Sequence, residues 1–108
     1  MEEVEWDKLF KKSQEGMYFE SIGEIEKSIE IYEYCVEKGW DGSHVYDKLS
    51  IYYKKNKRYK DSDRVIRKYL EIYKIWFDNN NFHDTWKMEN ENKYLIFKKR
   101  LDSIQQYL

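Results

Sequence analysis

Few side chains in this 108-residue chain could act as a base, a nucleophile or a metal ligand. His44 precedes Asp47 by three residues, and His83 directly precedes Asp84. Either pair could relay a proton, because imidazole titrates near neutral pH. Histidines at a helix start or in a loop are far more often structural, however, so the sequence predicts no general base at either pair.

Cys35 is the single cysteine, so no disulfide can form within the chain. Its spacing places it where two helices would cross, and there it should be buried, small and inert. Two histidines and one cysteine do not make a zinc site, which takes four ligands. The chain also has no glycine-rich phosphate loop. The sequence therefore predicts a protein that is not an enzyme, with no catalytic residue, no cofactor and no metal.

The basic run KKNKRYK, residues 54–60, raises a different possibility. With Tyr52, Tyr53 and Tyr59 beside it, the run could bind phosphates and stack bases. The interpretation that we favour is a solvated turn between two helices, with the tyrosines facing the core. Nucleic-acid binding is therefore the alternative function, and it predicts binding that weakens steeply with salt.

Composition indicates a folded chain without a membrane span. Aromatic residues make up 19% of the chain, and they bury large areas in a core. No apolar run approaches the roughly 18 residues of a transmembrane helix, and the acidic start MEEVEWDKLF is unlike a signal peptide. We expect a cytoplasmic protein. The many Lys, Glu, Ile, Tyr and Asn residues and the lack of alanine are typical of AT-rich genomes, which suggests a bacterial or phage origin.

The charges are unevenly distributed, although their sum is only −1. Residues 1–42 carry 12 acidic and 5 basic side chains, whereas residues 43–74 carry 4 acidic and 10 basic ones. An acidic first part beside a basic middle should select a partner of complementary charge and affect mainly its association rate.

Apolar periodicity predicts helices at about residues 3–21, 24–38, 44–55 and 60–77, and a last one from residue 84 or 90 to the end. Asp41 or Ser43 could cap the third helix. No alternation of period two persists, so the chain should be all-α. In the last helix, Tyr94, Phe97, Leu101, Ile104 and Leu108 form a seam that packs along another helix. That helix is either a cap on the fourth helix or the interface of a homodimer.

The first two hairpins repeat each other at an interval of 34 residues. The matching pairs are Phe19 and Tyr53, Ile25 and Tyr59, Ser28 and Ser62, Tyr32 and Ile66, and Val36 and Leu70. A 34-residue unit of two antiparallel helices resembles the tetratricopeptide repeat. The resemblance implies a single domain, residues 1–108, with one repeat at about 9–42, a second at about 43–77 and a capping helix at about 84–108.

Tetratricopeptide modules bind extended peptides or helices along the inner faces of their first helices. The resemblance places the following residues on that face: Phe10, Ser13, Met17, Glu20, His44, Asp47, Ile51, Lys54 and Lys55. The Lys and Asn clamp by which the chaperone-tail receptors of this family hold a carboxylate is absent. The function implied is a non-catalytic protein–protein interaction module, an adaptor or regulator, acting as a monomer or homodimer and away from membranes. A structural homo-oligomer is a further alternative.

Overall fold

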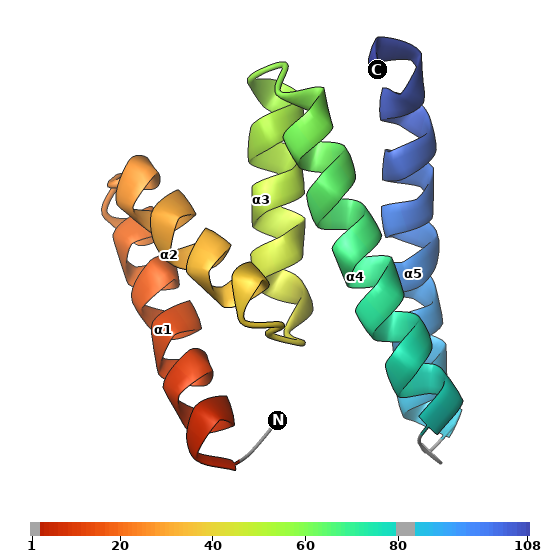
Figure 1. Ribbon diagram of the computed structural model, residues 1–108, viewed down its shortest axis with the longest axis horizontal. Helices are drawn as coiled ribbons and strands as arrows, with labels where there is room; N and C mark the ends of the chain where they lie inside the picture. Colours follow the sequence, from red (N-terminus) through yellow and green to blue (C-terminus); the bar gives the residue numbers. More distant parts are fainter. Residues whose placement is uncertain (1–2, 80–83) are drawn as a thin grey trace.

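The computed structural model describes residues 3–79 and 84–108, and these residues form five α-helices (Figure 1). The helices are α1 (Glu3–Ser21), α2 (Ile25–Glu37), α3 (Ser43–Lys55), α4 (Tyr59–Asn79) and α5 (Asp84–Ile104), and a short 3-10 turn, Gln105–Tyr107, follows. No strand occurs within this part of the chain. The all-α prediction is confirmed.

Consecutive helices pack against one another in chain order (Figure 1). α1 and α2 form a first hairpin, and α3 and α4 form a second. α5 lies along α4 and also contacts α3. α2 and α3 meet at the loop 38–42 and diverge from it, whereas α3 and α4 pack on each other more extensively. The first hairpin is therefore splayed away from the second.

The turn after α1 and the turn after α3 have the same backbone hydrogen bonds, 34 residues apart. The Glu24 amide donates to the Phe19 carbonyl at 2.9 Å, and the Arg58 amide donates to the Tyr53 carbonyl at 2.7 Å. Each bond spans six residues and closes a Schellman motif, which satisfies carbonyl groups at the helix end. The two helices of each hairpin are thus joined by equivalent turns, at the interval seen in the sequence.

Both turns require a residue in the left-handed region, and here the two hairpins differ. Gly23 has a φ of 82°, and its counterpart Lys57 has a φ of 62°. Glycine adopts this conformation without a steric cost, whereas a residue with a Cβ adopts it only at a steric cost. The left-handed conformation costs a side chain about 1–2 kcal/mol, and the greater backbone entropy of glycine in the unfolded chain offsets about 0.5–1 kcal/mol of this. We therefore expect Lys57→Gly to raise the free energy of unfolding by about 1 kcal/mol or less. Urea unfolding followed by circular dichroism measures it; Gly23→Ala is the reverse control and should lower stability.

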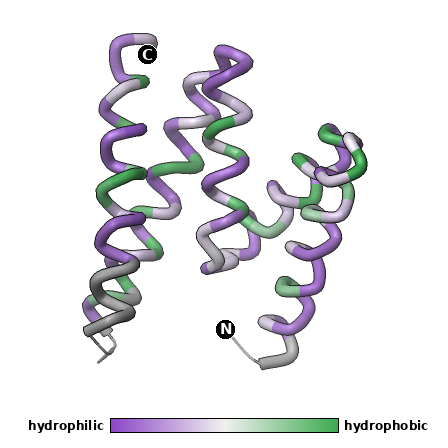
Figure 2. The backbone as a smooth tube through the Cα atoms, turned by 180° about the vertical axis from the view of Figure 1, so that it is seen from behind, coloured by the Kyte–Doolittle hydropathy of each residue, from purple (hydrophilic) through white to green (hydrophobic). Residues whose placement is uncertain are grey.

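One core extends from α1 to α5. Its buried hydrophobic residues are Leu9, Tyr32, Cys35, Val36, Trp40, Val45, Tyr46, Leu49, Tyr53, Val65, Ile66, Tyr69, Phe97, Leu101 and Ile104. Apolar positions recur as separate bands along the helices between hydrophilic stretches (Figure 2). Cys35 is buried, as predicted. Burial raises the pKa of its thiol to about 11, which makes the thiol a poor nucleophile.

The seam predicted in the last helix is only partly correct. Phe97, Leu101 and Ile104 are buried within the same chain, where Phe97 stacks on Tyr69 of α4 at 4.1 Å between ring centroids. Leu108 is exposed, because α5 ends at Ile104 and the 3-10 turn changes the direction of the chain. Tyr94 also contacts α4, where its ring stacks on Tyr73 at 4.9 Å between centroids, so the seam covers α4 over residues 94–104.

The predicted cap of α3 is wrong. Gly42 occupies the N-cap position, and neither Asp41 nor Ser43 makes a capping hydrogen bond there. The loop is held by Trp40 instead: the Tyr46 hydroxyl donates to the Trp40 carbonyl. A Cβ on Gly42 would lie 2.4 Å from the Trp40 indole nitrogen, so this position needs glycine for close packing.

Candidate functional site

The divergence of α2 and α3 leaves an open cleft of about 510 Å³ between them, which we call the α2–α3 cleft. The end of α1 closes one side of it. The lining residues are Glu20, Ile25, Ser28, Ile29, Tyr32, Lys48, Ile51, Tyr52, Lys55 and Asn56. Its volume falls within the range of about 300–1,000 Å³ that is usual for ligand sites.

The walls of the α2–α3 cleft are largely apolar. Ile25 on α2 is 38% exposed and Ile51 on α3 is 44% exposed, while Ile29 and Tyr52 are half-buried between them. Isoleucines exposed on both walls of one concave surface offer apolar area that a partner could bury. The sequence predicted Ile51 on a binding face, but it did not place Ile25 there.

A polar network lies at the α1 end of the cleft. The Tyr32 hydroxyl donates to Glu20 Oε1 at 2.7 Å, and Lys48 Nζ lies 3.2 Å from Glu20 Oε2. His44 Nε2 lies 3.3 Å from the Tyr32 hydroxyl oxygen and 3.9 Å from Glu20 Oε1. The network joins α1, α2 and α3.

Glu20 and Tyr32 of this network are poorly suited to acid–base catalysis. Burial alone would raise the pKa of Glu20, but hydrogen bonds from Tyr32 and Lys48 and the charge of Lys48 lower it below its ordinary value. Burial, and then the Glu20 carboxylate, raise the pKa of Tyr32 far above its ordinary value of 10.0. A carboxylate that binds protons weakly and a phenol that releases them weakly are a poor base and a poor acid near neutral pH.

On α1, the predicted binding residues do not form one continuous surface. Phe10 is exposed but stacks on Trp6 at 5.4 Å, near the start of the helix. Ser13 is buried and donates to the Phe10 carbonyl, so its side chain is not presented to a partner. Met17 is exposed, and Glu20 lines the cleft. α2 packs against α1 but leaves Phe10 and Met17 exposed.

On α3, helix α5 occupies part of the predicted binding face. Arg100 of α5 donates to Asp47 Oδ1 at 2.9 Å, and Lys54 donates to the Ser103 hydroxyl of α5 at 2.9 Å. Asp47 and Lys54 are therefore engaged within the chain. The remaining α3 residues of the prediction lie toward the first hairpin: His44 joins the polar network, and Ile51 and Lys55 line the cleft.

The arginines of the basic middle segment are paired within the chain. Arg58 lies 2.9 Å from Asp61, Arg64 lies 2.7 Å from Glu33, and Arg67 lies 3.0 Å from Asp63. The tyrosines are also engaged: Tyr53 is buried, and Tyr59 stacks on Tyr107 at 4.3 Å between ring centroids. These contacts engage the arginines and two of the tyrosines, so lysines such as Lys55 and Lys57 are the charges left for phosphates.

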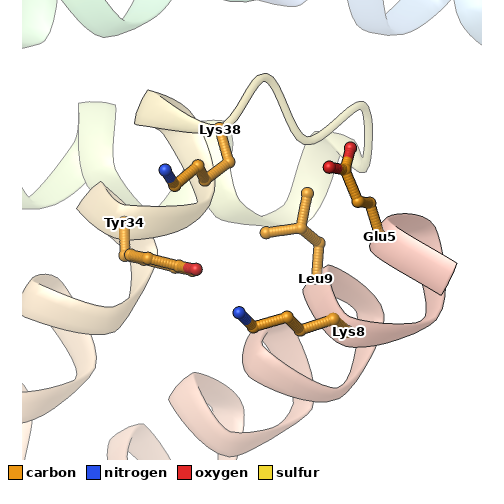
Figure 3. Close-up of a pocket in the computed structure, with 5 residues that line it drawn as sticks. All are labelled: Glu5, Lys8, Leu9, Tyr34 and Lys38. Atoms are coloured by element: carbon orange, nitrogen blue, oxygen red, sulfur yellow. The ribbon is translucent and has the colours of Figure 1, made fainter. Parts of the chain in front are cut away.

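A smaller pocket lies between α1 and α2 (Figure 3). Leu9 lies at its centre, Glu5 and Lys8 flank it on α1, and Tyr34 of α2 and Lys38, just after α2, flank it on the other side. Its volume of about 170 Å³ is below the usual range for ligand sites. The Lys38 ammonium lies 5.7 Å from the centroid of the Tyr34 ring, a cation–π contact between residues four apart. The α2–α3 cleft is the stronger candidate.

Four buried tyrosines predict that the protein loses stability in alkali. Burial raises the pKa of Tyr69 to about 12, and burial also raises those of Tyr32, Tyr46 and Tyr53. Above the unfolded value of 10.0, the unfolded chain loses these protons while the folded chain keeps them, so the free energy of unfolding falls as the pH rises.

Urea unfolding at about pH 9 and about pH 11, with tyrosinate absorbance as a second probe, tests this expectation. Tyr69→Phe should reduce the loss of stability between the two pH values, whereas Tyr18→Phe should leave it unchanged because Tyr18 is exposed. Complete titration of the tyrosines near pH 10 without loss of stability would contradict the burial argument.

Other expected sites are placed as follows. The His83–Asp84 pair lies outside the residues whose side chains the structure describes. Among the described residues, no group of three His, Cys, Asp or Glu side chains is arranged to hold a metal ion. Nor does any helix, as far as its residues are described, combine the length and apolar character needed to cross a membrane.

No protein-family model, curated protein or solved structure matches the chain.

Proposed function

We propose that this protein is a non-catalytic protein-interaction module with a tetratricopeptide-like arrangement of helices, which binds a partner protein at the α2–α3 cleft. The observation that carries the proposal is the exposure of isoleucines on both walls of that cleft. An interaction module needs an apolar surface that its own chain leaves uncovered, and this cleft supplies one.

Contacts between alternate helices support the tetratricopeptide-like arrangement. Glu20 of α1 pairs with Lys48 of α3, and Glu33 of α2 pairs with Arg64 of α4. Asp47 of α3 then pairs with an arginine of α5. In a stack of helical hairpins, each helix neighbours its counterpart in the next repeat, and each of these ion pairs joins such counterparts. The equivalent turns at a 34-residue interval support the same arrangement.

Protein binding is favoured over nucleic-acid binding by the distribution of charge. Arg58, Arg64 and Arg67 are neutralised by carboxylates of the same chain, so they would have to exchange one ion pair for another to hold a phosphate. The apolar walls of the cleft, in contrast, gain from a partner without breaking any contact that the chain already makes.

Ile51→Glu tests the proposed site, because it places a carboxylate on one apolar wall. The wild-type chain would first be used to capture a partner from its host, and the purified partner would then be measured by calorimetry. We expect Ile51→Glu to weaken binding by roughly tenfold or more, about 1.4 kcal/mol. Leu95→Glu is the matched control, since Leu95 is exposed on α5 away from the cleft. If Ile51→Glu left the affinity for the partner unchanged and Leu95→Glu lowered it, the interface would lie on α5 instead.

A further inference from the structure

The charges at the α2–α3 cleft are not equally available to a partner. The Glu20 carboxylate already accepts from Tyr32 and lies within ion-pair distance of Lys48. Lys55, in contrast, lines the cleft, is exposed, and makes no ion pair with the described part of the chain. The exposed Lys57 follows it in the turn. The charge that the cleft presents without a partner is therefore positive.

The cleft walls also restrict the backbone of an occupant. Both walls are α-helices, whose main-chain groups are bonded within each helix and cannot pair with an extended peptide. The Asn56 amide of the wall already donates to the Tyr52 carbonyl. An extended segment would leave its own amides and carbonyls unpaired against isoleucine, whereas a helix satisfies them internally.

The contact of α5 with the second hairpin shows how this fold seats a helix. The apolar side chains Phe97, Leu101 and Ile104 are buried, and Arg100 beside them pairs with Asp47 of α3. Here a helix packs its apolar stripe mainly on α4, and one charge beside the stripe pairs with a charge of opposite sign on α3. The α2–α3 cleft has the same elements, with the charge reversed: apolar walls at Ile25 and Ile51, and a basic side chain at Lys55.

We propose that the occupant of the α2–α3 cleft is an amphipathic helix of another protein, which packs apolar side chains on Ile25 and Ile51 and places carboxylates beside Lys55 and Lys57. The inference rests on the proposed function and specifies the chemistry of the partner. It excludes basic amphipathic helices as partners, because Lys55 would repel them.

Three designed helical peptides test the proposal with the full-length protein. The first has a leucine stripe flanked by glutamates, the second has the same stripe flanked by lysines, and the third has glutamates but serines in place of the leucines. Binding is followed by fluorescence anisotropy and by amide chemical shifts of the isotope-labelled protein. We expect the first peptide to bind about tenfold more tightly than either of the others. The amide shifts should centre on Ile25, Ile51 and Lys55.

Lys55→Glu should reverse the preference between the glutamate and lysine peptides. Lys99→Glu makes the same change of charge at an exposed position of α5 and should preserve the preference. The proposal would be overturned if the glutamate and lysine peptides bound equally tightly, or if the serine peptide bound as tightly as the first peptide. Amide shifts confined to α5 would overturn it as well. So would concentration-dependent shifts at Ile51 without any peptide, because a second copy of the chain would then fill the cleft.

The outcome also separates this inference from the proposed function. If the captured partner depends on Ile51 but the peptides show no preference for glutamate, the cleft binds proteins and the acidic helix is the wrong occupant. If neither the partner nor any peptide depends on Ile51, the proposed function fails at this cleft.

Discussion

Ending the chain at Asn79 is expected to unfold the protein. The truncation removes Phe97, Leu101 and Ile104, which are buried in the core. Each such side chain stabilises a fold by about 1.5–3 kcal/mol when it is buried, so the three together contribute roughly 5–9 kcal/mol. That is comparable with the whole stability of a typical domain, about 5–15 kcal/mol. The truncation also exposes the Tyr69 ring and leaves Asp47 without Arg100.

Circular dichroism and sedimentation of the truncated chain measure this result. Phe97→Ala is the graded version and should lower the free energy of unfolding by about 3–5 kcal/mol. Leu95→Ala on the exposed side of α5 should change it by less than about 0.5 kcal/mol. A truncated chain that stays helical, soluble and monomeric would show that α5 is not needed to cover α4.

Gly16→Ala should destabilise the protein, although alanine is the better helix former. At an exposed position of a helix, this change would raise the stability of the helix by about 1 kcal/mol. Here the added Cβ would lie 2.5 Å from Cε1 and 2.8 Å from Cδ1 of the Tyr32 ring. Tyr32 is fully buried and its hydroxyl is bonded to Glu20, so the ring cannot move aside without breaking other contacts. We expect a net loss of about 1–3 kcal/mol.

A double-mutant cycle isolates the contact between Gly16 and Tyr32. Tyr32→Leu alone should destabilise the protein by opening the core. In the Tyr32→Leu background, however, Gly16→Ala should be neutral or stabilising, because the ring that it would meet is gone. Urea unfolding of the four proteins gives the coupling free energy. A Gly16→Ala variant more stable than the wild type would show that α1 and α2 do not approach so closely.

The helices could be predicted well because their signals are local. Apolar residues three and four apart indicate each helix, and Gly23 and Gly39, both with positive φ, end two of them. The left-handed turn after α3 was not predicted, because Lys57 is not a residue that signals such a turn. Its equivalence to the turn at Gly23 is visible only in the structure, 34 residues along the chain.

The candidate site was predicted less completely, because it depends on how the hairpins are placed. A stripe of apolar residues shows which side of α1 is apolar, but not that α2 leaves Phe10 and Met17 exposed. Ile25 is spaced like a core residue and becomes a cleft residue only because α2 and α3 diverge. The pairing of Asp47 with Arg100 depends on the register of α5, which no local pattern specifies.

The bond between Tyr32 and Glu20, together with the ion pair from Glu20 to Lys48, has a consequence for selectivity. It ties three helices together near the closed end of the cleft, where the packed Trp40 loop joins α2 to α3. The opening is therefore preorganised, and a partner does not have to offset the entropy of ordering its walls. A cleft of fixed width should discriminate between partners by the size of the side chain that they insert, because a side chain that is too large cannot enter it.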